Sequence, residues 1–381
     1  MAKKRIVIVG TAHPLRGGLA AFNERIAREF IAEGHEVIIY TFSFQYPNFL
    51  FPGTTQYSSD PAPTDLDIRV RVNSVNPFNW LKIGKEIRNL QPDLVIMKFW
   101  IPFMGPCLGT IARKIRKNGK TKVISIVDNM IPHERRPGDM QFIRYFARSV
   151  DGFVAMSRSV EQDIHSFKTG KPVVFAPHPI YDNFGPAYPK AEAARLLGLD
   201  PDVQHLMFFG FIREYKGLYL AIEAMNDPRI RNLPVKLIVA GEFYEDPKPY
   251  LDLIAKLNVG DKLVLRTDFI PNGDVGKYFS ACDMVVQPYK TATQSGVTQI
   301  AYHYDCPMLV TDVGGLPEIV PHGRVGYVTE VSSAAIADAI VDFYANKRED
   351  AMVKEVIKDK VMFYWYSFTG AIHKMQEGMK S

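Results

Sequence analysis

Short apolar segments rich in valine and isoleucine recur along the chain, and segments with helical periodicity separate them. Strands are predicted at 5–9, 37–42, 94–97, 123–127, 153–156 and 173–175. Segments 19–33, 79–90, 106–117 and 159–167 repeat apolar residues every three to four positions and predict helices. Nearly continuous apolar strands that alternate with helices indicate a parallel sheet covered on both faces. This pattern restricts the first part of the chain to a doubly wound α/β fold.

A second series of the same kind begins near residue 205. Its strands are predicted at 205–209, 235–240, 263–265, 284–287, 308–311 and 326–328, with helices near 217–226, 248–257, 274–280, 297–304 and 334–345. Between the two series, segment 176–189 has four prolines, a glycine and an asparagine, a composition typical of a connector. The chain, at 381 residues, is also too long for one ordinary core.

We therefore predict two doubly wound α/β domains, residues 1–180 and 181–362, that face each other across a cleft. The segment 363–381 is predicted to be a helix that packs back on the first domain. In doubly wound sheets, ligands collect beyond the carboxyl ends of the strands, so the loops that follow the strands are the candidate sites.

Charge is unevenly distributed between the two halves. Residues 1–180 carry 25 lysines and arginines against 15 acidic residues, and the remainder carries 21 against 26. The segment Gly109–Lys122 concentrates the positive charge around one helical face. We interpret it as a surface that rests against anionic lipid headgroups, with an ordinary solvated helix flank as the alternative. Nucleic acid is not expected as a partner, because aromatic side chains are not interleaved with these cations.

The three cysteines lie far apart in the sequence without the spacing of a metal site, which favours a reducing compartment. The apolar run near the N-terminus has about five residues and predicts a strand, not a signal peptide. The protein is expected to be cytoplasmic and to act at the inner face of the membrane.

Three loops have the chemistry of anion binding. Gly17 and Gly18 open a helix after the first strand, where backbone N–H groups can approach a negative ligand, although neither a dinucleotide fingerprint nor a Walker loop is present. The stretch FFGFIREYKG places Gly210, Arg213 and Lys216 between a strand and a helix. In the third loop, Ser295, Gly296, Val297 and Thr298 form a helix start with capping hydroxyls. We predict that Arg213 and Lys216 neutralise a diphosphate held by this helix start.

The order of GFIREYKG, VAGE (Val239–Glu242), SACDMVVQPY and CPMLVTDVGGLPEIV resembles the glycogen-synthase-like retaining glycosyltransferases of family 4, which have the GT-B fold. The resemblance implies that Arg213 and Lys216 bind the donor diphosphate and stabilise the leaving group. It also implies donor contacts at the Gly17–Gly18 loop and at the helix start Ser295–Val297. We further predict that Gly210, Thr298 and Glu242 bind the donor, with Glu242, at the end of a predicted strand, near the nucleotide. Because cations and helix N–H groups can stabilise the charge that develops in the transition state, no metal and no other cofactor is expected.

The sequence departs from the family pattern in two places. The family has two glutamates seven residues apart in the third loop, and the corresponding positions fall near Ala292 and Ile300. The sugar and the base of the donor therefore stay open. Where many members have a histidine after the fourth predicted strand, this chain has Asp128, which we predict to be a catalytic-site residue. His133, Glu134 and Arg135 follow and are predicted to lie on the acceptor side.

The sequence thus predicts a glycosyltransferase that moves a sugar from a nucleotide-diphosphate donor to an acceptor hydroxyl. Retention is implied by the resemblance alone. The basic first domain favours a glycan or lipid-linked acceptor and a role in surface polysaccharide or glycolipid biosynthesis. Two alternatives remain: a catalytically silent nucleotide- or sugar-binding subunit, which the missing glutamates favour, and a nucleotide-sugar epimerase or hydrolase on the same fold, which would need carboxylates in the second domain.

Overall fold

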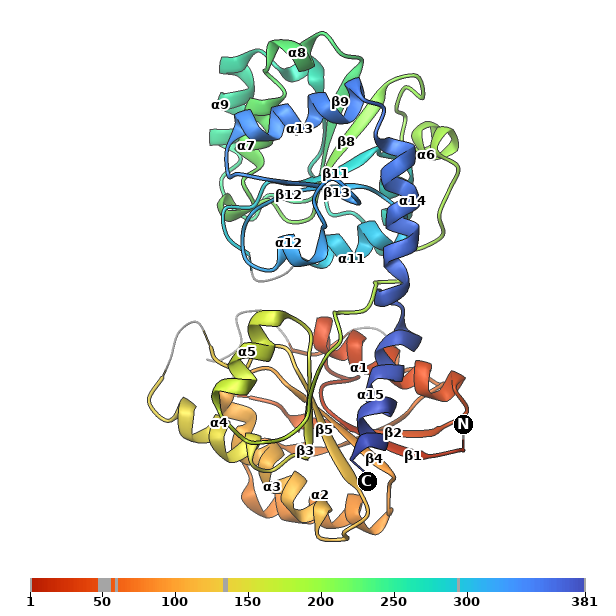
Figure 1. Cartoon of the computed structure of the whole chain (residues 1–381), viewed down its shortest axis with the longest axis vertical. Coiled ribbons are helices and arrows are strands. Elements are labelled where there is room, and N and C mark those ends of the chain that lie inside the picture. The colour runs from red at the N-terminus through yellow and green to blue at the C-terminus, as the bar shows by residue number, and fades with distance from the viewer. Residues whose placement is uncertain (1, 47–55, 59–60, 133–135, 293–294, 380–381) are drawn as a thin grey trace. The chain divides into compact units, whose positions relative to one another are not determined.

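The computed structural model describes residues 2–46, 56–58, 61–132, 136–292 and 295–379. The chain divides into two compact units (Figure 1). The first unit comprises Met1–His178 together with Trp365–Ser381, and the second comprises Pro179–Tyr364. The boundaries predicted after residues 180 and 362 each lie two residues from the observed division.

The first unit contains a seven-stranded parallel sheet in the order β3-β2-β1-β4-β5-β6-β7. Its strands are β1 (Arg5–Val9), β2 (Glu36–Phe44), β3 (Asp67–Asn73), β4 (Leu94–Phe99), β5 (Lys122–Val127), β6 (Gly152–Ala155) and β7 (Val173–Phe175). The helices are α1 (Gly18–Ala32), α2 (Pro77–Asn89), the 3₁₀ turn η2 (Pro102–Met104), α3 (Gly105–Arg116), α4 (Asp139–Ala147) and α5 (Arg158–Ser166). Strand β3 and helix α4 are not among the elements predicted from the sequence. Strand β3 reads DIRVRVN, and its largely exposed side chains at the sheet edge lack the continuous apolar run of the central strands.

The second unit repeats this plan with a six-stranded parallel sheet in the order β10-β9-β8-β11-β12-β13. Its strands are β8 (Gln204–Phe209), β9 (Val235–Ala240), β10 (Leu263–Arg266), β11 (Met284–Gln287), β12 (Met308–Thr311) and β13 (Gly326–Thr329). The helices are α6 (Lys190–Leu196), α7 (Leu218–Ala224), α8 (Pro228–Arg231), α9 (Lys248–Leu257), α10 (Asn272–Ala281), α11 (Gly296–His303), α12 (Leu316–Ile319), α13 (Ser333–Ala345) and α14 (Glu349–Asp359), with 3₁₀ turns η3 (Glu214–Lys216), η4 (Gly260–Lys262) and η5 (Lys360–Phe363).

The last helix, α15 (Trp365–Gly378), belongs to the first unit and lies beside α1 (Figure 1). Trp365, Phe368, Ile372 and Met375 recur every three to four residues and are buried in the same core as Phe22 of α1. The centroid of the Phe22 ring lies 5.2 Å from that of the Trp365 ring and 5.7 Å from that of the Phe368 ring. This apolar stripe explains why the segment folds as a helix and why it stays with the first unit.

Two cysteines that the sequence separates lie together in the second unit. The Sγ atoms of Cys282 and Cys306 are 3.2 Å apart, and both thiols are buried and free. Cys282 follows α10 and Cys306 precedes β12, so the packing of α10 and α11 on the sheet brings them together. None of the helices that the structure describes is long and apolar enough to cross a bilayer.

Candidate functional site

Two glycines let the ends of β8 and β9 approach closely. Gly210 follows β8 with a φ of +94°, and its N–H donates to the carbonyl of Ala240, 2.9 Å away. Gly241 follows β9 with a φ of +142°, and a Cβ at this position would overlap the carbonyl oxygen of Gly210. A side chain at Gly241 would push the two backbones apart. The loop after β8 is therefore held against the loop after β9.

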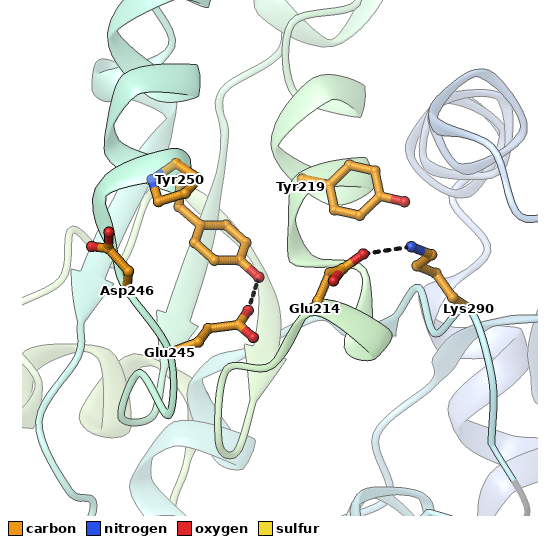
Figure 2. Close-up of a pocket in the computed structure, with 7 residues that line it drawn as sticks. Glu214, Tyr219, Glu245, Asp246, Tyr250 and Lys290 are labelled. Atoms are coloured by element: carbon orange, nitrogen blue, oxygen red, sulfur yellow. Dashed lines mark hydrogen bonds and ion pairs between the residues drawn. The ribbon is translucent and has the colours of Figure 1, made fainter.

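The loop after β8 ends at Gly217, where the chain enters α7. Gly217 has a φ of +66°, and a Cβ there would overlap the carbonyl oxygen of Pro288 in the loop after β11. The same two loops are joined by Lys290, whose N–H donates to the carbonyl of Tyr215 at 2.7 Å and whose Nζ lies 2.9 Å from Oε1 of Glu214 (Figure 2). The backbone contacts position η3 against the segment that leads to α11.

Lys216 is the central cation of this region. Its Nζ lies 3.1 Å from the point that a Cβ on Gly210 would occupy, and Cγ2 of Val297 lies 3.9 Å from the same point. Burial, together with the charge of Arg213, lowers the pKa of Lys216 to about 8. Among the described residues, no carboxylate pairs with Lys216 or with Arg213. A partly buried ammonium without a counterion is suited to an anionic ligand.

Helix α11 begins beside this cation. The hydroxyl of Ser295 accepts a hydrogen bond from the N–H of Val297 at 3.2 Å, and the hydroxyl of Thr298 donates to the carbonyl of Ser295 at 2.6 Å. These bonds fix the first turn and leave other N–H groups of that turn available for a ligand. A Cβ added to Gly296 would lie 3.3 Å from Cε2 of Tyr181, so Gly296 packs against this ring.

Glu242 is also part of this region. Its carbonyl accepts the N–H of Ile212 at 2.7 Å, which pairs the loop after β9 with the loop that carries Arg213. The structure thus brings together, within the second unit, Gly210, Arg213, Lys216, Glu242, Ser295, Gly296, Val297 and Thr298. The catalytic and donor-binding roles of these residues remain predictions.

Positions 292 and 300, where the family has glutamates, are apolar and pack in the core of the second unit. Ile300 is buried, and Ala292 lies against the same cluster. These side chains cannot supply the hydrogen bonds that the two glutamates would provide.

A surface pocket of about 470 Å³ includes Glu214 and Lys290 in its lining (Figure 2). It is lined by Glu214, Tyr219, Glu245, Asp246, Pro249, Tyr250 and Lys290. The hydroxyl of Tyr250 lies 2.5 Å from Oε1 of Glu245, and burial and this carboxylate raise the pKa of Tyr250. With three acidic side chains, the pocket is poorly suited to a diphosphate, and we place the anion site at Lys216 instead.

In the first unit, Gly17 is the N-cap of α1. It has a φ of +103°, and a Cβ on Gly17 or on Gly18 would meet no atom within 4 Å. The open space beside the helix start is compatible with a ligand, whereas packing alone would not require a glycine at position 18. Contact of these glycines with a donor remains a prediction.

Asp128 has a partner, Lys98, that was not predicted from the sequence. Nζ of Lys98 lies 2.7 Å from Oδ1 of Asp128. Burial lowers the pKa of Lys98 and raises that of Asp128, and the attraction between the two charges opposes both shifts. The signal in the sequence was a lysine inside the otherwise apolar strand Leu94–Phe99. His133, Glu134 and Arg135 lie outside the described residues, and their acceptor-side roles remain predictions.

Two arginines of the basic segment Gly109–Lys122 have partners inside the first unit, and the interpretation of the segment as a lipid-facing surface stays a prediction. Nε of Arg113 donates to the hydroxyl of Ser149 at 2.8 Å, and the guanidinium of Arg116 lies 2.7 Å from Oδ1 of Asp151. These arginines attach α3 to the end of α4 and to the turn before β6. At least two cations of the segment thus have structural partners.

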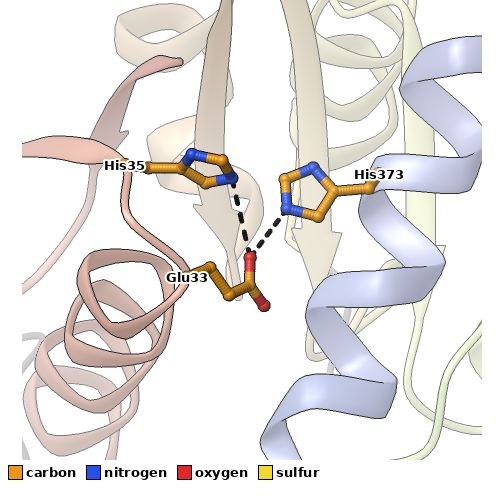
Figure 3. Close-up of side chains that lie close together, drawn as sticks. All are labelled: Glu33, His35 and His373. Carbon is orange, nitrogen blue, oxygen red and sulfur yellow. Dashed lines mark hydrogen bonds and ion pairs between the residues drawn. The ribbon is translucent and has the colours of Figure 1, made fainter. Parts of the chain in front are cut away.

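Glu33, His35 and His373 bring ligand atoms within 4.8 Å of one another, as in a metal site (Figure 3). However, the Nδ1 atoms of the two rings face donors of Lys4: its backbone N–H, 3.4 Å from His35, and its Nζ, 3.2 Å from His373. A neutral histidine that accepts at Nδ1 carries its proton on Nε2. Both Nε2–H groups then face the Glu33 carboxylate, at 3.7 and 2.8 Å. These protonated nitrogens fit hydrogen bonds that hold α15 against the first unit better than they fit a metal site.

Two family models match the chain. The model described as Glycosyltransferase Family 4 matches residues 16–184, and the model described as Glycosyl transferases group 1 matches residues 203–346. Together they cover most of both units. The chain belongs to the group 1, family 4 glycosyltransferases.

Curated relatives of this glycosyltransferase family member are distant. A D-inositol 3-phosphate glycosyltransferase of Streptomyces avermitilis is 27% identical over 236 residues, which are 59% of this chain and 50% of that protein. An uncharacterised glycosyltransferase of Methanocaldococcus jannaschii is 24% identical over 352 residues, 84% of this chain and 83% of that protein. The chain spans about half or less of the length of the D-inositol 3-phosphate glycosyltransferases it matches.

Solved structures with similar folds are glycosyltransferases and related synthases. Sucrose-phosphate synthase from Thermosynechococcus elongatus has a TM-score of 0.67 at 17% identity and covers 99% of both chains. HepE of Anabaena, in complex with UDP and glucose, has a TM-score of 0.67 at 15% identity and covers 98% of this chain and 100% of that one. The predicted fold class, two doubly wound α/β domains of the GT-B type, is confirmed.

Proposed function

We propose that the protein is a glycosyltransferase that moves a sugar, with retention, from a nucleoside-diphosphate donor to an acceptor hydroxyl. One observation carries the proposal: Lys216 is a partly buried cation without a carboxylate partner in the described structure, beside Gly210 and the first turn of α11. The family of the chain supports the reaction class. The UDP and ADP in the structures of HepE and of Arabidopsis starch synthase IV support a nucleotide-linked donor.

The proposed chemistry follows from the charge that the reaction builds. When the bond from the anomeric carbon to the diphosphate breaks, negative charge grows on the departing oxygen. Lys216, Arg213 and the N–H groups at the start of α11 are fixed donors for this charge, and they need no rearrangement during the step. Removing one such donor typically slows an enzyme about 100- to 1,000-fold. Because these groups supply the positive charge, we propose that no divalent cation is needed, so turnover should survive EDTA.

The donor sugar and ribose would meet neutral partners where the family has glutamates. Because Ala292 and Ile300 are apolar, only hydroxyl and amide side chains of the same loop remain for this contact. Hydrogen bonds from neutral groups are weaker than those from charged groups. A catalytically silent binding subunit is therefore the second candidate. An epimerase or hydrolase is the third, but the apolar residues at these two positions give it no carboxylates.

One experiment separates the three candidates. Nucleotide release and sugar transfer are measured with UDP-glucose, UDP-galactose, UDP-N-acetylglucosamine, GDP-mannose and ADP-glucose, after thermal shifts with UDP, GDP and ADP have identified the base. Lys216→Ala should lose the thermal shift and the turnover. Lys256→Ala, at an exposed lysine of α9, should lose neither. A thermal shift with the nucleotide sugar unchanged would favour the silent subunit. An epimerised nucleotide sugar would favour the epimerase, and release of free sugar without transfer to any acceptor would favour the hydrolase.

We further propose that the acceptor is a lipid-linked glycan at the cytoplasmic membrane face, as in surface polysaccharide synthesis. Support comes from α2, which packs beside α3 (Figure 1). Phe78 and Leu81 are 84% and 47% exposed there, and Lys82 and Lys85 are exposed on the same helical face. Apolar side chains flanked by lysines fit an anionic lipid surface. Arg113 and Arg116 have partners inside the first unit, whereas this face of α2 exposes both apolar side chains and lysines to solvent.

Vesicle sedimentation tests the membrane contact. The wild type should bind phosphatidylcholine vesicles that contain phosphatidylglycerol and release in high salt, and pure phosphatidylcholine should bind it less. Phe78→Ser/Leu81→Ser should weaken binding. Phe269→Ser, at a phenylalanine of the second unit that is 60% exposed, is the control and should not. Equal binding to both kinds of vesicle, or equal loss in the control, would contradict the proposal.

A further inference from the structure

Lys98 lies at the point of the first sheet where the strand order reverses. The chain runs from β1 outward to β2 and β3, and then returns to β4 on the other side of β1. Such a reversal opens a crevice at the carboxyl ends of the two central strands, where doubly wound sheets bind ligands. The pairing of Val9 with Met97 places Lys98 level with Gly10 at this end. Lys98 therefore lies near the carboxyl end of the central strand β4, where such a crevice forms.

The surrounding residues make room for the lysine and hold it in place. A Cβ on Gly10 would lie 3.4 Å from Cβ of Lys98 and still closer to Asn23 of α1, so a larger residue at Gly10 would crowd both side chains. Nζ of Lys98 lies 3.4 Å from the centre of the Phe22 ring, a cation–π contact. Phe22 belongs to α1, the helix that begins at the Gly17–Gly18 loop. The ammonium is thereby fixed between the sheet and the helix with the candidate donor loop.

The acidic partner comes from the next strand. β4 pairs with β5, and the N–H of Asp128, directly after β5, donates to the carbonyl of Phe99 at 2.9 Å. Oδ1 of Asp128 accepts from the Lys98 ammonium at 2.7 Å, whereas Oδ2 makes no hydrogen bond within the described residues. Lys98 is fully buried, but the Asp128 side chain is 26% exposed. No other charged side chain of the described structure acts on either group.

We propose that Lys98 is a positioning residue that holds the Asp128 carboxylate ionised and turned toward the crevice, so that Oδ2 accepts a hydrogen bond from a sugar hydroxyl of a substrate. This inference rests on the proposed glycosyltransferase function. A buried ion pair generally gives a fold little more stability than an apolar pair of the same size. A purely structural ion pair would not need a carboxylate whose side chain is 26% exposed and whose second oxygen has no partner among the described residues.

The test is a double-mutant cycle of Lys98→Met and Asp128→Asn, with nucleotide release from the donor that the panel above selects, with and without acceptor. Asp128→Asn should lower kcat/KM about 10- to 100-fold, the range of one hydrogen bond to a charged group. Lys98→Met should shift the acidic limb of the pH profile upward, because Asp128 without its cation protonates more easily. If Lys98 acts only through Asp128, the double variant should be no slower than Asp128→Asn.

The outcomes distinguish the possible failures. A wild type that turns over no nucleotide sugar contradicts the proposed function itself. If the wild type is active and the folded Asp128→Asn variant keeps full kcat/KM, the inference is wrong. It is also wrong if Lys98→Met lowers kcat/KM by the same factor at every pH, without a shift of the acidic limb. If Lys98→Met does not fold, the double variant is measured instead, because it carries no buried charge at this pair. A kcat/KM of the double variant below that of Asp128→Asn overturns the inference. Loss in hydrolysis without acceptor assigns the hydroxyl to the donor, and loss in transfer alone assigns it to the acceptor.

Discussion

Replacing Lys216 with methionine should make the protein more stable while it removes the ability to bind a diphosphate. The side chains have similar length, but methionine has no charge to desolvate. A lysine whose pKa falls from 10.5 to about 8 has its charged form destabilised by about 3 kcal/mol at neutral pH. Because water reaches part of the side chain, we expect about half of this, about 1.5 kcal/mol. For a unit of this size, that corresponds to a rise in Tm of about 3–6 °C.

The sign of the pH dependence follows from the depressed pKa. Below pH 8 both folded and unfolded chains carry the proton, and the destabilisation is fully present. Between pH 8 and 10.5 the folded chain releases the proton first, so the wild type becomes more stable relative to Lys216→Met. Thermal denaturation at pH 7 and pH 10 should therefore give a large difference at pH 7 and a small one at pH 10.

Nucleotide binding should change in the opposite direction. UDP, GDP or ADP, whichever shifts the wild type, should leave the Tm of Lys216→Met unchanged, and nucleotide-sugar turnover should fall about 100- to 1,000-fold. Lys256→Met, at an exposed lysine of α9, is the matched control and should change neither stability nor binding. A Lys216→Met variant that is less stable than wild type at pH 7, or whose stability difference is the same at both pH values, would refute the reasoning.

Four further outcomes follow from the structure. The affinity of the wild type for the nucleoside diphosphate should fall as pH rises through about 8, because Lys216 loses its proton; calorimetry near pH 9 should detect proton uptake on binding. Gly217→Ala should destabilise the second unit by about 2 kcal/mol more than Gly198→Ala, since both glycines have positive φ but only a Cβ at Gly217 meets the backbone; chemical denaturation compares them. Phe368→Ala should destabilise the first unit by about 3–5 kcal/mol in the same assay. Burial alone would raise the pKa of Glu33, but hydrogen bonds from neighbouring side chains lower it below 4.5, so the stability that Glu33→Gln loses at neutral pH should shrink as the pH falls below that value.

Much of the fold was predictable because its signals are local. The helix predicted at 248–257 is α9 without change of bounds, and every central strand was located from its apolar run. The loops that we predict to bind an anion were also identifiable, since Arg213, Lys216 and the Ser295 cap lie next to glycines that mark strand-to-helix transitions. Local signals failed where exposed or charged residues dominate. The edge strand β3 and helix α14, with its sequence EDAMVKEVIKD, lack a wide apolar face.

The pairings that define the site were decided only by the tertiary structure. Lys98 and Asp128 are thirty positions apart and meet because β4 and β5 pair in one register. Lys216 approaches Val297 across the sheet because β8 and β11 are neighbours. Side-chain periodicity depends on residues two to four positions apart, so the amino-acid sequence by itself determined strands, helices and loops. Which loop ends meet depends on strand order and register, and these are set by how the whole hydrophobic surface is buried.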